Sequence, residues 1–331
     1  MSWFSDLVGF SESHAAVHAN LTVTGTLMTS AANGRTFGIG TLATPSLKEL
    51  RAAVGPLTGG RLQVQQVIAD VTVLHQRAEN IGALFQVASQ FNLLEMVGPH
   101  RTPEDGVTDY AYDRTQGPAC AMAAGPATIY RNYFAPVGSQ RGQSADQQLD
   151  MLADVGAMLG NTNQQLWTMR NGYALCSADG LDTIRRRLAS LDEAGLDALR
   201  GALRIGVHRN VEVTKGRGGG GPVTQAFCSA LPVAYSPHGD HAWEPFAQLV
   251  LEASYEATLL AALRNARTGG SPRVFLTLLG GGAFGNRSEW IGQAIRRALL
   301  LAEQTELDVR IVSYRSADPM VSDLVEEFSQ R

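Results

Sequence analysis

Residues 273–314 read RVFLTLLGGGAFGNRSEWIGQAIRRALLLAEQTELDVRIVSY, and this stretch decides the class of fold. Its first seven residues, RVFLTLL, are a short apolar run that is typical of a buried strand. The glycine-rich segment 280–286 predicts a loop, and apolar residues at helical spacing follow it over 288–304. DVRIVSY at 308–314 then predicts a second strand. A helix is the usual connection between two parallel strands, so we expect these two strands to be parallel.

The same alternation continues outward from this stretch. A long amphipathic segment at 241–266 predicts a helix before the first strand, with a kink near Pro245. Three further apolar runs predict buried strands, namely LQVQQVIADV at 62–71, ALFQVASQF at 83–91 and VTQAFCSALPVAY at 223–235. Helices and strands that alternate in this way favour a mostly parallel sheet with helices on both faces.

Two regions depart from this alternation. LTVTGTLMTS at 21–30 alternates and predicts a strand, and the Asn33-Gly34 pair after it is a strong hairpin-turn signal. Residues 138–204 instead carry apolar positions at helical spacing and few β-branched residues. We therefore expect a β-rich extension over 1–60 and an α/β domain over 61–331 that contains a helical insert at 138–204.

The segment GPACAMAAGPATIYRNYF at 117–134 predicts a change of structure along its length. Small residues open it, and the Gly125-Pro126 pair interrupts a helix. Its second half, TIYRNYF, is aromatic and β-branched, which favours a strand with one buried face.

The loop 280–286 is the most informative local feature. It follows a buried strand and precedes a helix near Ser288, so backbone N–H groups and the positive end of the helix dipole converge there. Glycine lets a phosphate approach the main chain with no side chain in the way. We expect this loop to bind a phosphate or pyrophosphate. The alternative is a tight strand-to-helix turn that binds nothing.

Two familiar phosphate-binding patterns fit the loop poorly. No Gly-Lys-Ser or Gly-Lys-Thr follows, which excludes a P-loop. Gly280, Gly282 and Gly285 do match the G-x-G-x-x-G pattern of dinucleotide-binding units. However, only one strand follows the loop, and the acidic residue Asp308 begins that strand instead of ending it. A nicotinamide-dinucleotide-dependent oxidoreductase is therefore the less favoured hypothesis.

VFLTLLGGGAFGN, followed by a helix and the strand DVRIVSY, resembles the C-terminal part of macrodomains, especially the poly(ADP-ribose) glycohydrolase-like branch. ASYEATLLAAL is similar to the penultimate helix of that family, and VTQAFCSALPVAY to the strand before it. The resemblance covers roughly 62–135 and 204–331. It implies a divergent member with a macrodomain-like three-layer α/β/α mixed sheet, an N-terminal β extension and a helical insert.

The resemblance also implies an ADP-ribose site. VIADVTVLH is similar to the strand whose terminal acidic residue holds adenine, here Asp70. GALFQVASQFNLLE is similar to the strand that ends in the ribose loop, where Asn92 would bind ribose hydroxyls. TQGPACAMAAG would be the first phosphate loop and its helix, and Phe284 would pack on the distal ribose. The residues implied in ligand binding are Asp70, Val71, Asn92, Gln116, Gly117, Gly280, Gly281, Gly282, Ala283, Phe284, Gly285 and Asn286.

Hydrolysis of an ADP-ribosyl linkage needs a carboxylate or an ordered water near the anomeric carbon, because the transition state resembles an oxocarbenium ion. Gln116-Gly117-Pro118 stands where the paired glutamates of the glycohydrolase branch fall, so the acid must come from elsewhere. Glu95 is our first candidate, with Asn92 as its catalytic partner. The other nearby acids suggest a solvated loop, namely Glu104, Asp105, Asp109 and Asp113. A non-catalytic ADP-ribose-binding module is the alternative.

Composition limits the partners. Lys+Arg of 27 against Asp+Glu of 31 excludes a generally basic nucleic-acid coat, so we expect nucleic acid only as a modified substrate. Cys120, Cys176 and Cys228 are widely spaced, which suits a reducing compartment. No apolar run approaches the roughly 20 residues of a membrane helix. We expect a cytoplasmic protein without metal or cofactor whose partner is ADP-ribose or an ADP-ribosylated macromolecule.

Overall fold

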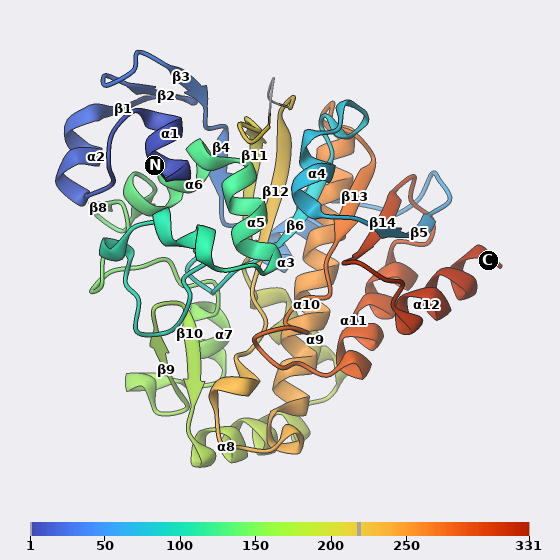
Figure 1. Ribbon diagram of the computed structural model, residues 1–331. Coiled ribbons are helices and arrows are strands. Elements are labelled where there is room, and N and C mark those ends of the chain that lie inside the picture. Colours follow the sequence, from blue (N-terminus) through green and yellow to red (C-terminus); the bar gives the residue numbers. More distant parts are fainter. Residues whose placement is uncertain (1, 217–219, 331) are drawn as a thin grey trace.

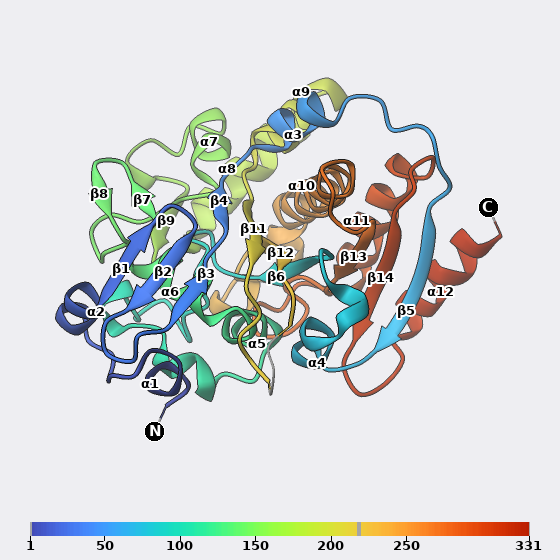
Figure 2. The same ribbon diagram turned by 90° about the horizontal axis from the view of Figure 1, so that it is seen from above.

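The computed structural model describes residues 2–216 and 220–330, and its centre is a mixed seven-stranded sheet (Figures 1 and 2). Five neighbouring strands are parallel, and β11 runs antiparallel between β12 and β4. The α/β class with a mostly parallel sheet is confirmed. In spatial order the strands are β4 (Thr41–Ala43), β11 (Gly206–Val211), β12 (Val223–Cys228), β6 (Leu84–Ala88), β13 (Arg273–Leu276), β14 (Asp308–Ser313) and β5 (Gln63–Ile68).

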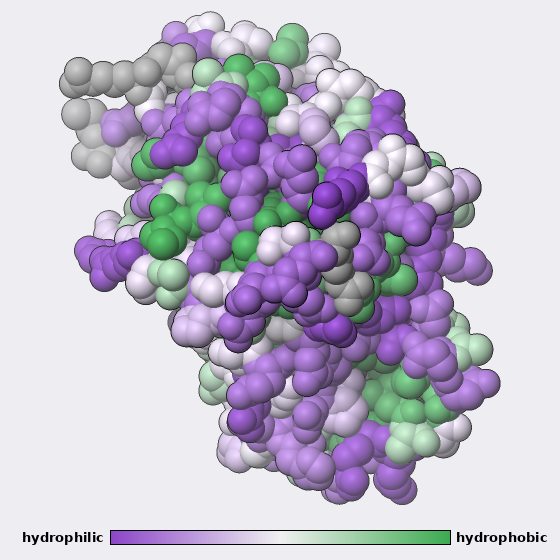
Figure 3. All heavy atoms as spheres, turned by 90° about the vertical axis from the view of Figure 1, so that its right-hand side faces the viewer, coloured by the Kyte–Doolittle hydropathy of each residue, from purple (hydrophilic) through white to green (hydrophobic). Residues whose placement is uncertain are grey.

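The strand β5 differs from the expectation that 62–71 is a buried strand. It lies at the edge of the sheet, pairs only with β14, and alternates between exposed and half-buried residues. Its glutamines are consistent with that position, because an edge strand has no second neighbour to cover it. Figure 3 shows this side of the molecule, where small green apolar areas interrupt a mainly purple surface. Ile68 is one of the exposed apolar side chains.

Helices cover both faces of the sheet (Figure 2). On one face, α10 is almost wholly buried and contacts most of the other helices of that layer. Length and composition alone would allow α10 to cross a membrane, but 89% of its most apolar window is buried inside the protein. This layer contains α10 (Asp240–Arg267, with Pro245 inside it), α11 (Ser288–Leu301), α3 (Leu47–Val54), α8 (Ala178–Ala189) and α9 (Glu193–Ala202), and α12 (Pro319–Ser329) packs on α11 and β5.

The opposite face carries α4 (Val71–Gln76), α5 (Gln116–Ala123) and α6 (Gly125–Tyr133). The expected strand at TIYRNYF is wrong, because α6 continues through it to Tyr133. Pro126 lies in the first turn of α6, where its missing N–H has no helical partner to lose. The pair Gly125-Pro126 therefore separates two helices and does not end helical structure.

The N-terminal residues form a separate small layer against α6. The expected strand 21–30 is a hairpin, because Gly25, with φ of 58°, turns the chain inside it. The turn at Asn33-Gly34 is confirmed between β2 and β3. The elements of this layer are α1 (Trp3–Val8), α2 (His14–Asn20), β1 (Leu21–Thr24), β2 (Leu27–Ser30) and β3 (Thr36–Gly38).

The insert at 138–204 is less helical than expected. Besides α8 and α9 it contains only the short helix α7 (Ala153–Met158), and a hairpin of β9 (Trp167–Arg170) and β10 (Tyr173–Cys176). The hairpin turns at Asn171-Gly172, where both residues have positive φ. The remaining pieces are β7 (Pro136–Val137), β8 (Gln140–Arg141) and 3-10 turns at 78–80, 103–105, 108–112, 162–164 and 233–235.

Helix α5 lies unusually close to the central strand β6 at Gly117. A Cβ atom at Gly117 would lie 2.0 Å from the main-chain oxygen of Ala88. We predict that Gly117→Ala lowers the free energy of unfolding by about 1–3 kcal/mol, because the helix must move away from the strand. Chemical denaturation measures this change. Gly201→Ala in α9, whose Cβ would make only an ordinary contact, should leave stability unchanged or raised.

Candidate functional site

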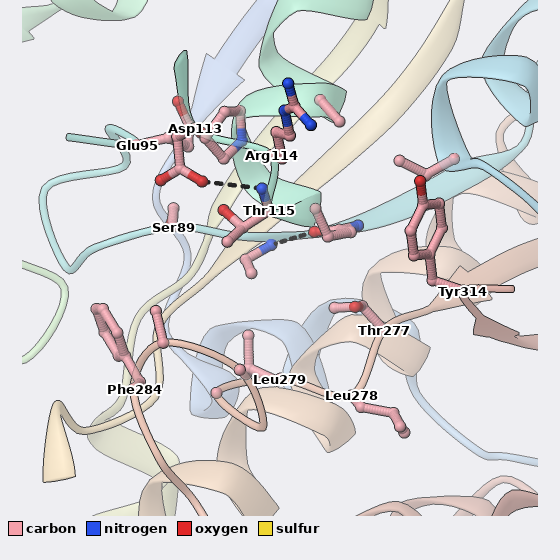
Figure 4. Close-up of a pocket in the computed structure, with 18 of the residues that line it drawn as sticks. Ser89, Glu95, Asp113, Arg114, Thr115, Thr277, Leu278, Leu279, Phe284 and Tyr314 are labelled. Atoms are coloured by element: carbon pink, nitrogen blue, oxygen red, sulfur yellow. Dashed lines mark hydrogen bonds between the residues drawn. The ribbon is translucent and has the colours of Figure 1, made fainter. Parts of the chain in front are cut away.

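A cavity of about 550 Å³ lies at the carboxyl ends of the five parallel strands. Its size is within the usual range of small-molecule sites, and this edge of an open parallel sheet is where ligands commonly bind. Strand ends from all five strands line it (Figure 4). They contribute Ala69 and Asp70 after β5, Ser89 and Gln90 after β6, Ala230 after β12, Thr277 to Gly280 after β13, and Tyr314 after β14.

The cavity opens where β6 and β13 separate. The two strands pair only as far as Phe85, whereas β6 remains paired with β12 to its end. Beyond Phe85, the side chain of Gln116 bonds to the edge of β6 that β13 leaves uncovered. Its Nε2 donates to the carbonyl of Gln86 at 2.8 Å, and its Oε1 accepts from the N–H of Ala88 at 2.9 Å. Gln116 therefore lines the cavity, as predicted, but its amide is used by the main chain of β6.

Asp70 and Tyr314 define one end of the cavity. Asp70 caps α4, because its Oδ1 accepts from the N–H of Thr72 at 2.7 Å. Tyr314 is 62% exposed and comes directly after β14, the strand next to β5. It therefore lies beside Asp70 and Val71 at the rim of the cavity. A half-open slot with a carboxylate and an aromatic ring suits a planar base that carries an amino group.

The glycine-rich loop forms the floor of the cavity. Gly280 has φ of 76°, and a Cβ there would lie 2.4 Å from the Cβ of Ala230, so only glycine fits. Gly282 faces open space, with no atom within 4 Å of an added Cβ. Four of the predicted loop residues line the cavity: Gly280, Gly282, Ala283 and Phe284.

The other predicted loop residues shape the loop without lining the cavity. Asn286 is buried, donates to the carbonyl of Leu231 at 2.8 Å, and donates its main-chain N–H to the carbonyl of Gly280. Gly285, with φ of 70°, closes the turn. Gly281 faces a neighbouring hollow between the loop and the start of α12. Gly117 is likewise a packing glycine beneath the cavity.

Asn92 does not reach the cavity, which corrects the expected ribose contact. Its Nδ2 donates to Gln148 at 2.8 Å, and its Oδ1 accepts from the N–H of Leu94 at 3.1 Å. The hairpin turn of the insert lies directly on it, since a Cβ at Gly172 would be 2.6 Å from that oxygen. The sequence at β6 alone could not indicate this, because the covering residues come from the insert.

Glu95 stands at the end of the cavity away from Tyr314, with Phe284 on the facing side of that end (Figure 4). Its carboxyl is 1% exposed, with Oε1 3.4 Å from Nη2 of Arg131. Its Oε2 has no hydrogen-bond partner within the described residues. Burial raises the pKa of Glu95 to about 8, because the loss of water outweighs the attraction of Arg131. Burial therefore favours the protonated form of this carboxyl, which can donate a proton.

The other acids between 95 and 113 mostly bond to groups of the loop itself, as expected for most of them. Asp105 accepts from the N–H of Thr102, and Asp109 pairs with Arg101 at 2.8 Å. Glu104 accepts from the N–H of Ala145 at 2.8 Å. Asp113 is the exception, because it lines the cavity while it accepts from the N–H of Thr115 at 2.8 Å (Figure 4).

Several residues of the cavity wall were not among the predicted site residues. Tyr173 from the insert and Tyr235 after β12 form an aromatic wall with Phe284, at ring-centroid distances of 5.1 to 5.7 Å. No local signal marks Tyr173, whereas Tyr314 could have been found from its position directly after a parallel strand. Arg114 and Lys215 lie on the rim, and neither side chain has a hydrogen-bond or ion-pair partner among the described residues. No group of three His, Cys, Asp or Glu side chains suited to a metal ion occurs in the described part of the chain.

No protein-family model and no curated protein matches this sequence. Among solved structures, the chain is similar to poly(ADP-ribose) glycohydrolase from Deinococcus radiodurans in complex with ADP-ribose, at 10% identity and a TM-score of 0.46, over 87% of this chain and 94% of that one. It is also similar to the glycohydrolase from Thermomonospora curvata, at 12% identity and a TM-score of 0.46, over 92% and 93% of the two chains. The inhibitor-bound form of that enzyme, with ADP-HPD, gives 14% identity and a TM-score of 0.45, over 91% and 93%.

The raised pKa of Glu95 predicts a pH-dependent effect of Glu95→Gln on stability. The unfolded chain ionises this carboxyl near pH 4.5 and the folded chain only near pH 8, so the wild type loses stability as pH rises between those values. The variant has no such loss. Its stability relative to the wild type should therefore rise by on the order of 4 kcal/mol from pH 5 to pH 9, measured by denaturation. A constant difference across this range would contradict a protonated Glu95.

Proposed function

We propose that this chain binds ADP-ribose or the ADP-ribosyl group of a modified substrate in the cavity, and hydrolyses the linkage next to Glu95. The observation that carries the proposal is the order of groups along one cavity. A base-binding end at Asp70 and Tyr314 is followed by the glycine floor and then by the buried acid Glu95. The loop GGGAFGN, which resembles the family's phosphate loop, supplies that floor.

The charges of the cavity suit a diphosphate in its middle. The floor at 280–283 presents main chain with little side-chain bulk, and α11 begins five residues later with no side-chain cap on its first N–H groups. Arg114 and Lys215 are exposed cations on the rim with no partner in the part of the chain that the structure describes, so they are available to a phosphate. The acidic residues of the lining are Asp70, Glu95 and Asp113, and none of them belongs to the floor at 280–283.

In the proposed reaction Glu95 acts as the general acid. Its proton passes to the leaving atom as the bond from the anomeric carbon to that atom breaks, and water adds to the anomeric carbon. The proton that the water loses returns to the Glu95 carboxylate. Arg131 lies 3.4 Å from the carboxyl and stabilises the ionised form between these two steps. Phe284 and Tyr173 would hold the distal ribose against this end of the cavity.

A non-catalytic binding module is the second candidate, and the burial of Glu95 favours it. A carboxyl that is 1% exposed and paired with Arg131 has little access to water. The oxidoreductase hypothesis has no such support. Asp308 lies at the amino end of β14, away from the cavity, and pairs with Arg273 and Arg310.

Titration of the protein with ADP-ribose, with AMP and NAD as controls, tests the binding site. We expect ADP-ribose to bind at least tenfold more tightly than either control, because only ADP-ribose offers a diphosphate flanked by a base and a free ribose. In a turnover assay on an ADP-ribosylated peptide or nucleic acid, Glu95→Gln should reduce the rate by about 10²–10⁴-fold. Unchanged affinity for ADP-ribose in this variant separates catalysis from binding. No turnover by the wild type, with binding retained, would support the binding module.

Gly282 offers a test of the phosphate floor that leaves the fold intact. A Cβ at Gly282 meets no atom within 4 Å, so Gly282→Ala and Gly282→Asp should unfold at the same temperature as the wild type. The added methyl group should weaken ADP-ribose binding about tenfold, and the added carboxylate should weaken it further by repelling phosphate. Calorimetry measures both effects. Equal affinity of the Asp variant and the wild type would place the diphosphate elsewhere.

A further inference from the structure

The carboxylate of Glu12 joins the N-terminal layer to the turn at 106–110, which leads into the cavity wall that begins at Ala111. Glu12 lies between α1 and α2, and its Oε1 accepts from the N–H of Val107 at 2.8 Å. Its Oε2 accepts from the N–H of Thr108 at 2.7 Å, and Oε1 also accepts from the hydroxyl of Tyr133 at 2.8 Å. These contacts span 95 residues or more along the chain.

The turn at 106–110 has space for this carboxylate only because residue 106 is a glycine. Gly106 has φ of 80°, and a Cβ there would lie 2.5 Å from the carboxyl carbon of Glu12. A second contact comes from α1, where the indole of Trp3 donates to the carbonyl of Thr108 at 3.0 Å. Three main-chain groups of this turn, the N–H groups of Val107 and Thr108 and the carbonyl of Thr108, therefore bond to the N-terminal layer.

Tyr110 connects this contact to the proposed acid. Tyr110 lies in the short 3-10 turn that begins at Thr108, and its ring is 1% exposed. Its hydroxyl accepts from the main-chain N–H of Glu95 at 3.0 Å. Phe4, Met28 and Leu94 belong to the same buried apolar cluster, which joins the N-terminal layer to the segment that carries Glu95.

We propose that Glu12 is a positioning residue. It fixes the turn at 107–110, and the turn, through Tyr110, fixes the main chain at Glu95 on the wall of the cavity. The consequence for activity rests on the proposed function, whereas the effect on the wall does not. In this arrangement the N-terminal layer is part of the active-site scaffold.

Glu12→Gln tests the contact with little change in size. The Gln oxygen still accepts from Val107 and Tyr133, but its NH₂ then faces the N–H of Thr108, and two donors repel each other. The matched control is Ser13→Ala, which removes the neighbouring N-cap of α2 without contact to the wall. Both variants weaken the N-terminal layer, so a merely structural role of Glu12 predicts similar results for the two.

Amide hydrogen exchange of the ligand-free protein gives the first readout. We expect exchange over 106–113 and at Glu95 to accelerate at least tenfold in Glu12→Gln and less than twofold in Ser13→Ala. Equal exchange in the two variants would overturn the proposal, whatever the protein binds. The exchange measurement therefore tests the role of Glu12 whether or not the proposed function is correct.

Turnover gives the second readout if the wild type hydrolyses an ADP-ribosylated substrate. Glu12→Gln should lower kcat at least tenfold with KM within twofold, because Asp70, Tyr314 and the glycine floor are untouched. Tyr110→Phe, which removes only the acceptor for the Glu95 N–H, should lower kcat similarly while exchange at 107–108 stays at the wild-type rate. A rise in KM with unchanged kcat in Glu12→Gln would contradict positioning of Glu95.

Discussion

The close approach of helix α5 to the central strand β6 is the constraint on which the site depends. Gly117 permits it, since any Cβ would collide with the carbonyl of Ala88. Gln116 secures it, since its amide bonds to main-chain groups of β6 that β13 no longer reaches. The strands β6 and β13 can therefore separate without leaving buried polar groups unpaired, and that separation is the cavity. Arg114 precedes α5 by two residues, so the position of this helix also places Arg114 at the rim of the cavity.

The site is closed by units that lie far from it in the sequence. The hairpin of the insert covers Asn92 through Gly172 and contributes Tyr173 to the aromatic wall. In the N-terminal layer, Glu12 bonds to the main chain at Val107 and Thr108, in the segment that follows Glu95. Both units therefore shape the end of the cavity at Glu95, whereas the end at Asp70 is built by β5, β14 and the start of α4.

Buried polar groups concentrate around Glu95. The guanidinium of Arg131 is wholly buried, packs on the ring of Phe227 with its central carbon 3.8 Å from the ring centre, and donates to the carbonyl of Leu93 at 3.0 Å. Its Nη1 and the Oε2 of Glu95 have no partner among the described residues. Unpaired buried groups of this kind lower stability, so they are more common at functional sites than in an ordinary core.

The sequence by itself determined the sheet, the order of most strands and helices along the chain, and the glycine loop. These features follow from short-range patterns: apolar runs, helical spacing and glycines at a strand end. It also selected Asp70 and Glu95, both of which line the cavity, because each lies within a few residues of a predicted strand. Short-range patterns misassigned TIYRNYF, whose aromatic residues are buried on a helix, and the segment 21–30, which folds back at Gly25.

Only the tertiary structure decided which of the predicted residues meet in the cavity. Asn92 and Asn286 have the right residue type and position, yet their amides bond to distant main-chain or side-chain groups. Tyr173 and Glu12 carry no local signal, because their roles depend on contacts across 80 or more residues. The physical reason is that the spacing of apolar residues in a sequence indicates which face of a helix or strand is buried. A site depends instead on which elements, distant in the sequence, pack against one another.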